Sequence, residues 1–198
     1  MSIVLLGSTS GSCTLQEQAV AGTSVLTLPV GTGTVVANNV NSAIVSGTAV
    51  ASTSGTSIDF TSIPSWVKRI TVMFNAVSTN GSSNIIVQLG TSSGVTTSGY
   101  TGRYQFYSGS SSSAGGSLST GFLTIQNAAS SLCYGTFVFF NINGNTWLCS
   151  SNMTDDGGNY NIQCNGIIAL ASTLDRVRIT TVSGTPTFDN GTLNILYE

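Results

Sequence analysis

The sequence predicts an all-β protein, in which a short-stranded amino-terminal arm is followed by a jelly-roll-like antiparallel β-sandwich. Three observations support this fold class. No window of about ten residues keeps apolar side chains at helical spacing without an intervening glycine, proline or Ser/Thr cluster. Strand-like runs recur about every ten to fifteen residues, which is typical of an all-β sandwich. Thr and Val, which suit a half-buried pleated surface, are frequent in these runs.

The amino-terminal region contains short strand-like pieces separated by turn residues. The apolar run at residues 3–6 is too short for a signal-peptide core and is expected to be an uncleaved strand. Further pieces are residues 11–16 (Gly-Ser-Cys-Thr-Leu-Gln) and 26–29 (Leu-Thr-Leu-Pro). A Ser/Thr/Gly linker follows at residues 52–56. We therefore divide the chain into a β-rich arm, residues 1–50, and a β-sandwich body, residues 51–198.

The strand candidates of the body differ in their apolar pattern. In the run at residues 70–77, Ile70, Val72 and Phe74 share one side, which predicts a buried face and a solvated face. Residues 137–140 and 167–170 are apolar without alternation, so they are central strands or lie under a subunit interface. The predicted strands are residues 35–37, 43–52, 70–77, 84–89, 103–107, 122–126, 134–140, 146–150, 161–170, 177–182 and 193–197.

Two connections of the body have distinct compositions. Residues 108–117 consist of Ser, Gly and Ala and have no apolar anchor, which predicts a mobile exposed loop. Pro64 fixes a turn, and Trp66 is expected to close one end of the sandwich.

The composition predicts a surface that is covered by protein partners. Charged residues are only 6% of the 198 residues, with Lys+Arg 5 against Asp+Glu 7, while hydrophobic residues are 40%. Few surface charges remain to keep a single copy in solution. Nucleic acid is excluded as a partner because the only adjacent basic pair is Lys68 and Arg69. A membrane is excluded because no run reaches the roughly eighteen apolar residues of a spanning helix.

The reactive side chains do not form a catalytic set, so we expect no enzyme activity. The chain has no histidine, which excludes Ser-His-Asp and Cys-His nucleophiles. The carboxylates are scattered, and the adjacent pair Asp155 and Asp156 lies in a turn rather than across a cleft, as a glycosidase requires. No cofactor is expected.

The cysteines and acidic residues give little support for a metal. Cys13, Cys133, Cys149 and Cys164 are far apart and lack a C-x-x-C spacing, so buried free thiols are expected, as is usual in cytosolic proteins. The segment that begins at Asp155 could offer oxygen ligands to Ca²⁺, but it lacks the alternating ligands and closing Glu of a dedicated loop. A plain hairpin turn is the simpler interpretation, and the calcium alternative stays open.

A possible sugar-binding patch surrounds the Ser/Gly segment. Tyr100, Arg103 and Tyr107 are candidate glycan or receptor contacts, because aromatic rings beside an arginine can stack on sugars. Tyr104 and Phe106 share the other strand face and are expected to enter the core.

Two stretches carry a family resemblance. The string Gly-Ser-x-Thr-Leu-Gln, Ala-Gly-Thr, Leu-Thr-Leu-Pro and Gly-Thr within residues 11–34 resembles the amino-terminal segment of tailed-bacteriophage virion surface proteins. Residues 57–60 and 63–74 are similar to the opening of a tail-fibre-like or decoration-protein β-domain. Together the stretches cover somewhat under half of the chain.

The resemblance implies a non-enzymatic structural protein of the virion surface that is assembled in the host cytoplasm. The protein is expected to be a homotrimer that is anchored to other virion proteins by its arm. It would decorate and stabilise the capsid or form a short fibre. The implied anchoring residues are Thr14, Leu15, Leu26, Leu28 and Pro29. The alternative is a receptor-binding tail-fibre tip that recognises host surface glycan through the loops around residues 100–107 or residues 155–160.

Overall fold

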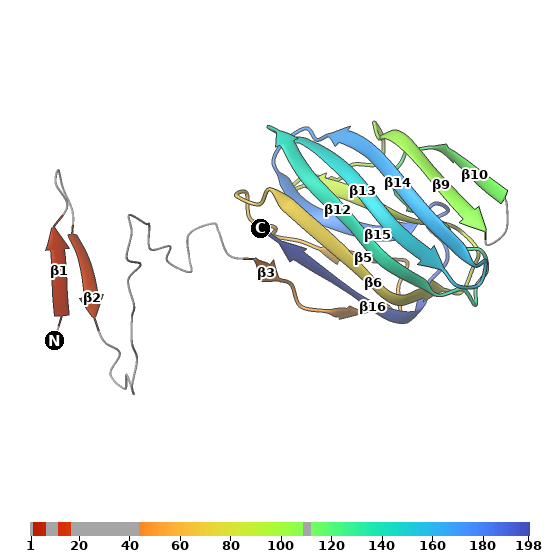
Figure 1. Ribbon diagram of the computed structural model, residues 1–198, viewed down its shortest axis with the longest axis horizontal. Helices are drawn as coiled ribbons and strands as arrows, with labels where there is room; N and C mark the ends of the chain where they lie inside the picture. Colours follow the sequence, from red (N-terminus) through yellow and green to blue (C-terminus); the bar gives the residue numbers. More distant parts are fainter. Residues whose placement is uncertain (1, 7–11, 17–43, 109–111) are drawn as a thin grey trace. The chain divides into compact units, whose positions relative to one another are not determined.

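The structure, a computed structural model, describes residues 2–6, 12–16, 44–108 and 112–198 (Figure 1). The chain divides into two units, Met1–Ala37 and Asn38–Glu198. In the first unit, β1 (Ser2–Leu6) and β2 (Ser12–Gln16) form a two-stranded antiparallel sheet. The strand expected near residue 3 is therefore present as β1, and β2 contains Thr14 and Leu15. Leu26, Leu28 and Pro29 lie outside the described residues, as does the strand expected at residues 35–37.

The second unit begins earlier than the sandwich body expected at residues 51–198, and from here on we call residues 1–37 the arm and residues 38–198 the body. The body is built from strands and turns, and its described residues contain no helix. Its strands are β3 (Val45–Ser46), β4 (Val50–Ala51), β5 (Ser57–Phe60), β6 (Arg69–Thr79), β7 (Ile85–Thr91), β8 (Gly94–Val95), β9 (Thr101–Ser108), β10 (Ser112–Ser117), β11 (Phe122–Thr124), β12 (Cys133–Asn143), β13 (Thr146–Asp155), β14 (Tyr160–Ala169), β15 (Leu174–Thr181) and β16 (Phe188–Tyr197).

These strands form two antiparallel sheets packed as a sandwich. The large sheet has the order β10-β9-β14-β13-β12-β6-β16-β3, and β4 also pairs with β16. The small sheet has the order β11-β7-β15-β5, and β8 pairs with β7. Figure 1 shows β12, β13, β14 and β9 side by side in the large sheet. The predicted all-β sandwich is confirmed, and the jelly-roll connectivity stays a prediction.

The core lies between the two sheets and is rich in phenylalanine. Phe122 of β11 contacts Phe139 of β12 and Tyr100, with ring centroids 5.5 and 5.0 Å apart. Phe137 packs on Phe74 at 5.7 Å. Ile70, Val72 and Phe74 are all buried, as their alternation predicts. The expected end plug, Trp66, is partly buried and packs against Tyr197 with ring centroids 6.0 Å apart.

Two expectations about the edges of the large sheet need correction. The composition of residues 108–117 predicts a loop throughout, but β10 pairs with β9 in the register Gly115↔Gln105. A Cβ at Gly115 would lie 2.3 Å from the backbone oxygen of Tyr104, so glycine permits the close pairing. The single strand predicted at residues 43–52 is also wrong, because residues 44–52 contain the two short strands β3 and β4, and both pair with β16.

Candidate functional site

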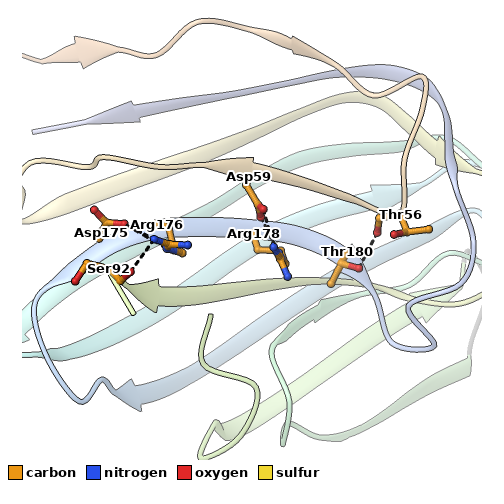
Figure 2. A network of polar contacts seen from close by, with 7 residues as sticks. All are labelled: Thr56, Asp59, Ser92, Asp175, Arg176, Arg178 and Thr180. Carbon is orange, nitrogen blue, oxygen red and sulfur yellow. Dashed lines mark hydrogen bonds and ion pairs between the residues drawn. The ribbon is translucent and has the colours of Figure 1, made fainter. Parts of the chain in front are cut away.

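The charged side chains of the small sheet neutralise one another on its outer face (Figure 2). The Arg178 guanidinium donates two hydrogen bonds of 2.7 Å to the Asp59 carboxylate, its cross-strand partner on β5. These bonds raise the pKa of Arg178. Arg176 forms an ion pair of 3.0 Å with Asp175 and also donates to the Ser92 carbonyl at 3.2 Å. The small sheet thus presents a polar, internally paired surface.

The outer face of the large sheet has a different chemistry in its middle. Cross-strand pairing places outward side chains of β14, β13 and β12 in rows, for example Gln163, Asn152 and Thr136. None of these outward side chains is charged. We call this surface the central face, and its residues are Tyr134, Thr136, Val138 and Phe140 of β12, Leu148, Ser150, Asn152 and Thr154 of β13, and Asn161, Gln163, Asn165 and Ile167 of β14.

One row of the central face is apolar throughout. Phe140, Leu148 and Ile167 are direct cross-strand neighbours on β12, β13 and β14. They remain exposed by 38%, 40% and 37%. Three large apolar side chains that adjoin in one row form a patch, which distinguishes them from the scattered exposed apolar residues of any surface.

Charged residues lie at the two sides of the central face, on the flanking strands. Arg69 of β6 is the neighbour of Phe140 and pairs with Glu198. Arg103 of β9 is the neighbour of Asn165, and it donates a hydrogen bond of 3.0 Å to the Ser117 hydroxyl of β10.

The three predicted glycan contacts do not lie together. Arg103 and Tyr107 share the exposed side of β9 with Gln105, and Tyr107 is 45% exposed. Tyr104 and Phe106 lie on the opposite side and pack partly buried against the core, as predicted. Tyr100 is only 4% exposed, so it belongs to the core and the expectation of a surface contact at this position is wrong.

The burial of Tyr100 is explained by its hydroxyl group, which finds backbone partners inside the sandwich. The hydroxyl accepts a hydrogen bond of 2.9 Å from the Leu89 N–H and donates one of 2.9 Å to the Thr96 carbonyl. Burial raises the pKa of this phenol above its usual value. A buried tyrosine hydroxyl that both donates and accepts a hydrogen bond leaves no polar group unpaired. The closeness of Tyr100 to Arg103 in the sequence therefore does not indicate a shared surface.

The acidic turn at Asp155 is closed by backbone hydrogen bonds. Asp155 is fully buried, and its two carboxylate oxygens accept 2.7 Å bonds from the N–H groups of Asn127 and Gly158. Asp156 accepts a bond of 2.6 Å from the Leu132 N–H. Both carboxylates therefore have structural partners, as in the hairpin-turn interpretation. In the part of the chain that the structure describes, no group of three or more His, Cys, Asp or Glu residues is placed to hold a metal ion.

The three cysteines of the body are free and buried, as predicted. Burial raises the pKa of the Cys133 thiol from 9.0 to about 12, and the nearby carboxylates of Asp155 and Asp156 add to this shift. Burial also raises the pKa of Cys149. Cys13 lies in β2, where the structure describes the strand but not the side chains.

Two surface hollows of the body each lack the combination of an acid with a base. One hollow, at an end of the sandwich, is lined by Pro64, Lys68 and Trp147 among others, and Lys68 supplies its charge. Another, beside β11, is lined by hydroxyl-bearing and apolar residues including Ser83 and Thr120. Neither hollow offers the paired groups that general acid–base catalysis needs.

The fold and its surfaces define a β-sandwich module with a separate amino-terminal unit and an uncharged, partly apolar central face. No family model, no curated protein and no solved structure matched the chain. Among the described residues, no helix is long and apolar enough to cross a lipid bilayer.

Proposed function

We propose that this protein is a non-enzymatic structural component of a tailed-phage virion. In this proposal it is a homotrimer on the particle surface, anchored by its amino-terminal arm to other virion proteins, and it decorates and stabilises the capsid or forms a short fibre. The observation that carries the proposal is the central face, where three middle strands of a large sheet expose amide, hydroxyl and apolar groups but no charge. Such a surface suits permanent contact with protein rather than turnover of a substrate.

The proposed anchoring works through backbone pairing. The arm contains an antiparallel pair, β1 and β2, whose outer edges each present unpaired N–H and C=O groups within the described residues. A strand of a neighbouring virion protein can pair with such an edge. The pairing would also protect the edge from aggregation. The proposed body is a jelly-roll-like sandwich that packs around a threefold axis.

We expect removal of residues 1–37 to leave the body folded and to abolish incorporation into virus particles. The body keeps all of its sheet pairing in this variant, because β3 and β4 begin after residue 37 and pair with β16. Circular dichroism and urea unfolding would test the fold, and quantitative mass spectrometry of purified particles would test incorporation. The full-length chain expressed in parallel is the control. Truncated protein that enters particles at the full-length level would show that the arm is not the anchor.

The copy number separates the two particle locations. A capsid-decorating protein is present in many copies across subunit junctions, and particles without it lose resistance to heat. A short fibre is present in few copies, and its loss reduces adsorption to the host.

A second candidate function, a receptor-binding fibre tip for host glycan, is favoured by the exposed side of β9. Arg103, Gln105 and Tyr107 project there, and Gln163 of β14 adjoins Gln105. We expect a tip of this kind to give signals on a glycan array that Arg103→Ala and Tyr107→Ala each abolish. The Val182→Ala variant, which changes an exposed side chain that follows β15 of the small sheet and lies outside the central face, is the control. An array without signal, together with unchanged adsorption of both variants, would remove this candidate.

A further inference from the structure

We propose that the central face is the surface through which copies of this chain contact one another, with Phe140, Leu148 and Ile167 buried at the subunit interface. The inference rests on the proposed function, and it assigns the self-association of that proposal to a particular face. The occupant of the face is a second copy of this chain. The polar groups of the central face, the distribution of charge around it and the size of the large sheet each support this occupant.

The polar groups of the central face are of the kind that can pair with themselves. Asn152, Asn161, Gln163 and Asn165 carry carboxamides, which both donate and accept hydrogen bonds. The Ser and Thr hydroxyls of the face do the same. Lys and Arg only donate, and ionised Asp and Glu only accept, so they need a partner of different chemistry. Where copies of the face meet about the proposed threefold axis, such dual-function groups can pair with one another without leaving buried groups unpaired.

The distribution of charge gives the second argument. Near a symmetry axis the same residues of each copy come together, so a charge at that place would meet like charges from the other copies. The middle strands β12, β13 and β14 avoid this cost because they direct no charged side chain outward. Arg69 and Arg103 lie on the flanking strands β6 and β9. The face thus has an amide and hydroxyl centre, an apolar row at its end next to the β12–β13 turn, and charge only on the flanking strands. Depletion of charge in the middle of a surface is typical of protein interfaces.

The size of the large sheet is adequate for a stable interface. Strands lie about 4.8 Å apart and rise about 3.3 Å per residue, so a sheet of about eight strands of about eight residues measures roughly 38 by 26 Å. Its outer face therefore covers about 1,000 Å², whereas a stable interface removes about 800 Å² from each partner. The three strands of the central face cover roughly 480 Å² of it, so a stable interface centred on this face would extend over the flanking strands β6 and β9.

The apolar pattern of two strands gives an independent argument. Residues 137–140 and 167–170 are apolar without alternation, which indicates strands covered on both sides. The small sheet covers Phe137, Phe139 and Ile168, which are all buried. Phe140 and Ile167 point the other way and remain exposed. A second copy would supply the missing cover.

The test is the mass of the full-length protein by light scattering at micromolar concentration. We expect the wild type to have three times the mass of one 20.3 kDa chain, and Leu148→Asp to have the mass of one chain. The matched control is Val182→Asp, because Val182 is 55% exposed and follows β15 of the small sheet. This control is expected to keep the mass of the wild type. Circular dichroism of each variant would confirm that its sandwich is folded.

A mixture of two variants distinguishes a contact at the face from a general loss of structure. Leu148→Asp and Leu148→Lys should each be monomeric alone, and equal amounts mixed together should associate, since opposite charges then meet at the interface. A Leu148→Asp protein with the wild-type mass would overturn the inference, as would a monomeric wild type or a Val182→Asp protein that dissociates. The composition of purified particles is a separate measurement. Absence of this protein from virions would contradict the proposed function, but it would not contradict self-association through the central face.

Discussion

Replacing Asp155 by asparagine is expected to lower the free energy of unfolding by about 2–4 kcal/mol, a large part of the total stability of an ordinary domain. The two side chains have nearly the same shape, so the loss comes from hydrogen bonding and not from a cavity. Urea unfolding at pH 7, followed by circular dichroism or tryptophan fluorescence, measures the effect.

The physical reason is that Asp155 uses both of its oxygens as acceptors. One oxygen accepts from Asn127, in the segment before β12, and the other from Gly158, in the turn between β13 and β14. Asparagine has one carboxamide oxygen, so its NH₂ group must face one of the two backbone N–H donors. That buried donor then lacks a partner, and the remaining bond loses its charge assistance.

The control for this prediction is Asp189→Asn, because Asp189 is an exposed acid on β16. A surface change of this kind is expected to alter the stability by no more than about 0.5 kcal/mol. Equal losses in the two variants would contradict the structural role of Asp155 and would indicate that only the net charge matters.

Alternation of apolar and polar residues predicts many strands of the body. The prediction fails where polar residues point inward, because the alternation is then lost. The expected strand at residues 146–150 is the first half of β13, which continues to Asp155. Its second half directs Ser151, Met153 and Asp155 inward. The Ser151 hydroxyl accepts a 3.0 Å bond from the Cys164 N–H, and Asp155 closes a turn. These polar side chains are buried because they have partners on other segments, which a local pattern does not reveal.

The strand β10 shows a second limit, because backbone pairing alone defines it. Its sequence, Ser-Ser-Ala-Gly-Gly-Ser, has no apolar periodicity, and flexible-linker composition predicted a loop. The partner strand β9 provides a regular edge, and glycine allows the chain to approach it closely.

The central face shows a third limit, since it depends on register between distant strands. Phe140 and Leu148 lie close in sequence on either side of the turn between β12 and β13. Ile167 joins them only because β14 pairs with β13 in the register Leu148↔Ile167. The sequence indicated that residues 137–140 and 167–170 are covered twice, but it could not show that their outward side chains form one row.

High pH is expected to destabilise the body through Cys133. Its thiol has a pKa raised to about 12 in the fold, by burial first and by the charges of Asp155 and Asp156, against 9.0 for an ordinary thiol. The unfolded chain therefore releases this proton at lower pH than the folded chain does. The contribution of the neutral Cys133 thiol to the free energy of unfolding is fully present below pH 9. It is lost as the pH rises toward 12, at up to about 1.4 kcal/mol per pH unit.

Two structural features explain why the fold keeps the thiol neutral. Cys133 is fully buried at the start of β12, where a thiolate would lose its hydration. Its Sγ atom also donates a hydrogen bond of 3.4 Å to the Ile125 carbonyl, which a thiolate has no proton to make. Tyr100 acts in the same direction from about pH 10 upward, because burial raises the pKa of its phenol as well.

The Cys133→Ala variant separates the contribution of this thiol from that of the other buried groups. At pH 7–8 it is expected to be less stable than the wild type by about 1–2 kcal/mol, because it leaves a small cavity. Between pH 9 and 11 the two stability curves should approach each other and cross, since only the wild type loses the Cys133 contribution, at up to about 1.4 kcal/mol per pH unit. Urea unfolding at a series of pH values with a thiol reductant present measures both curves. Curves that stay parallel across this range would show that Cys133 titrates alike in the folded and unfolded chains. The slope that remains in the stability curve of Cys133→Ala measures the other buried groups, which include Tyr100 and the other thiols.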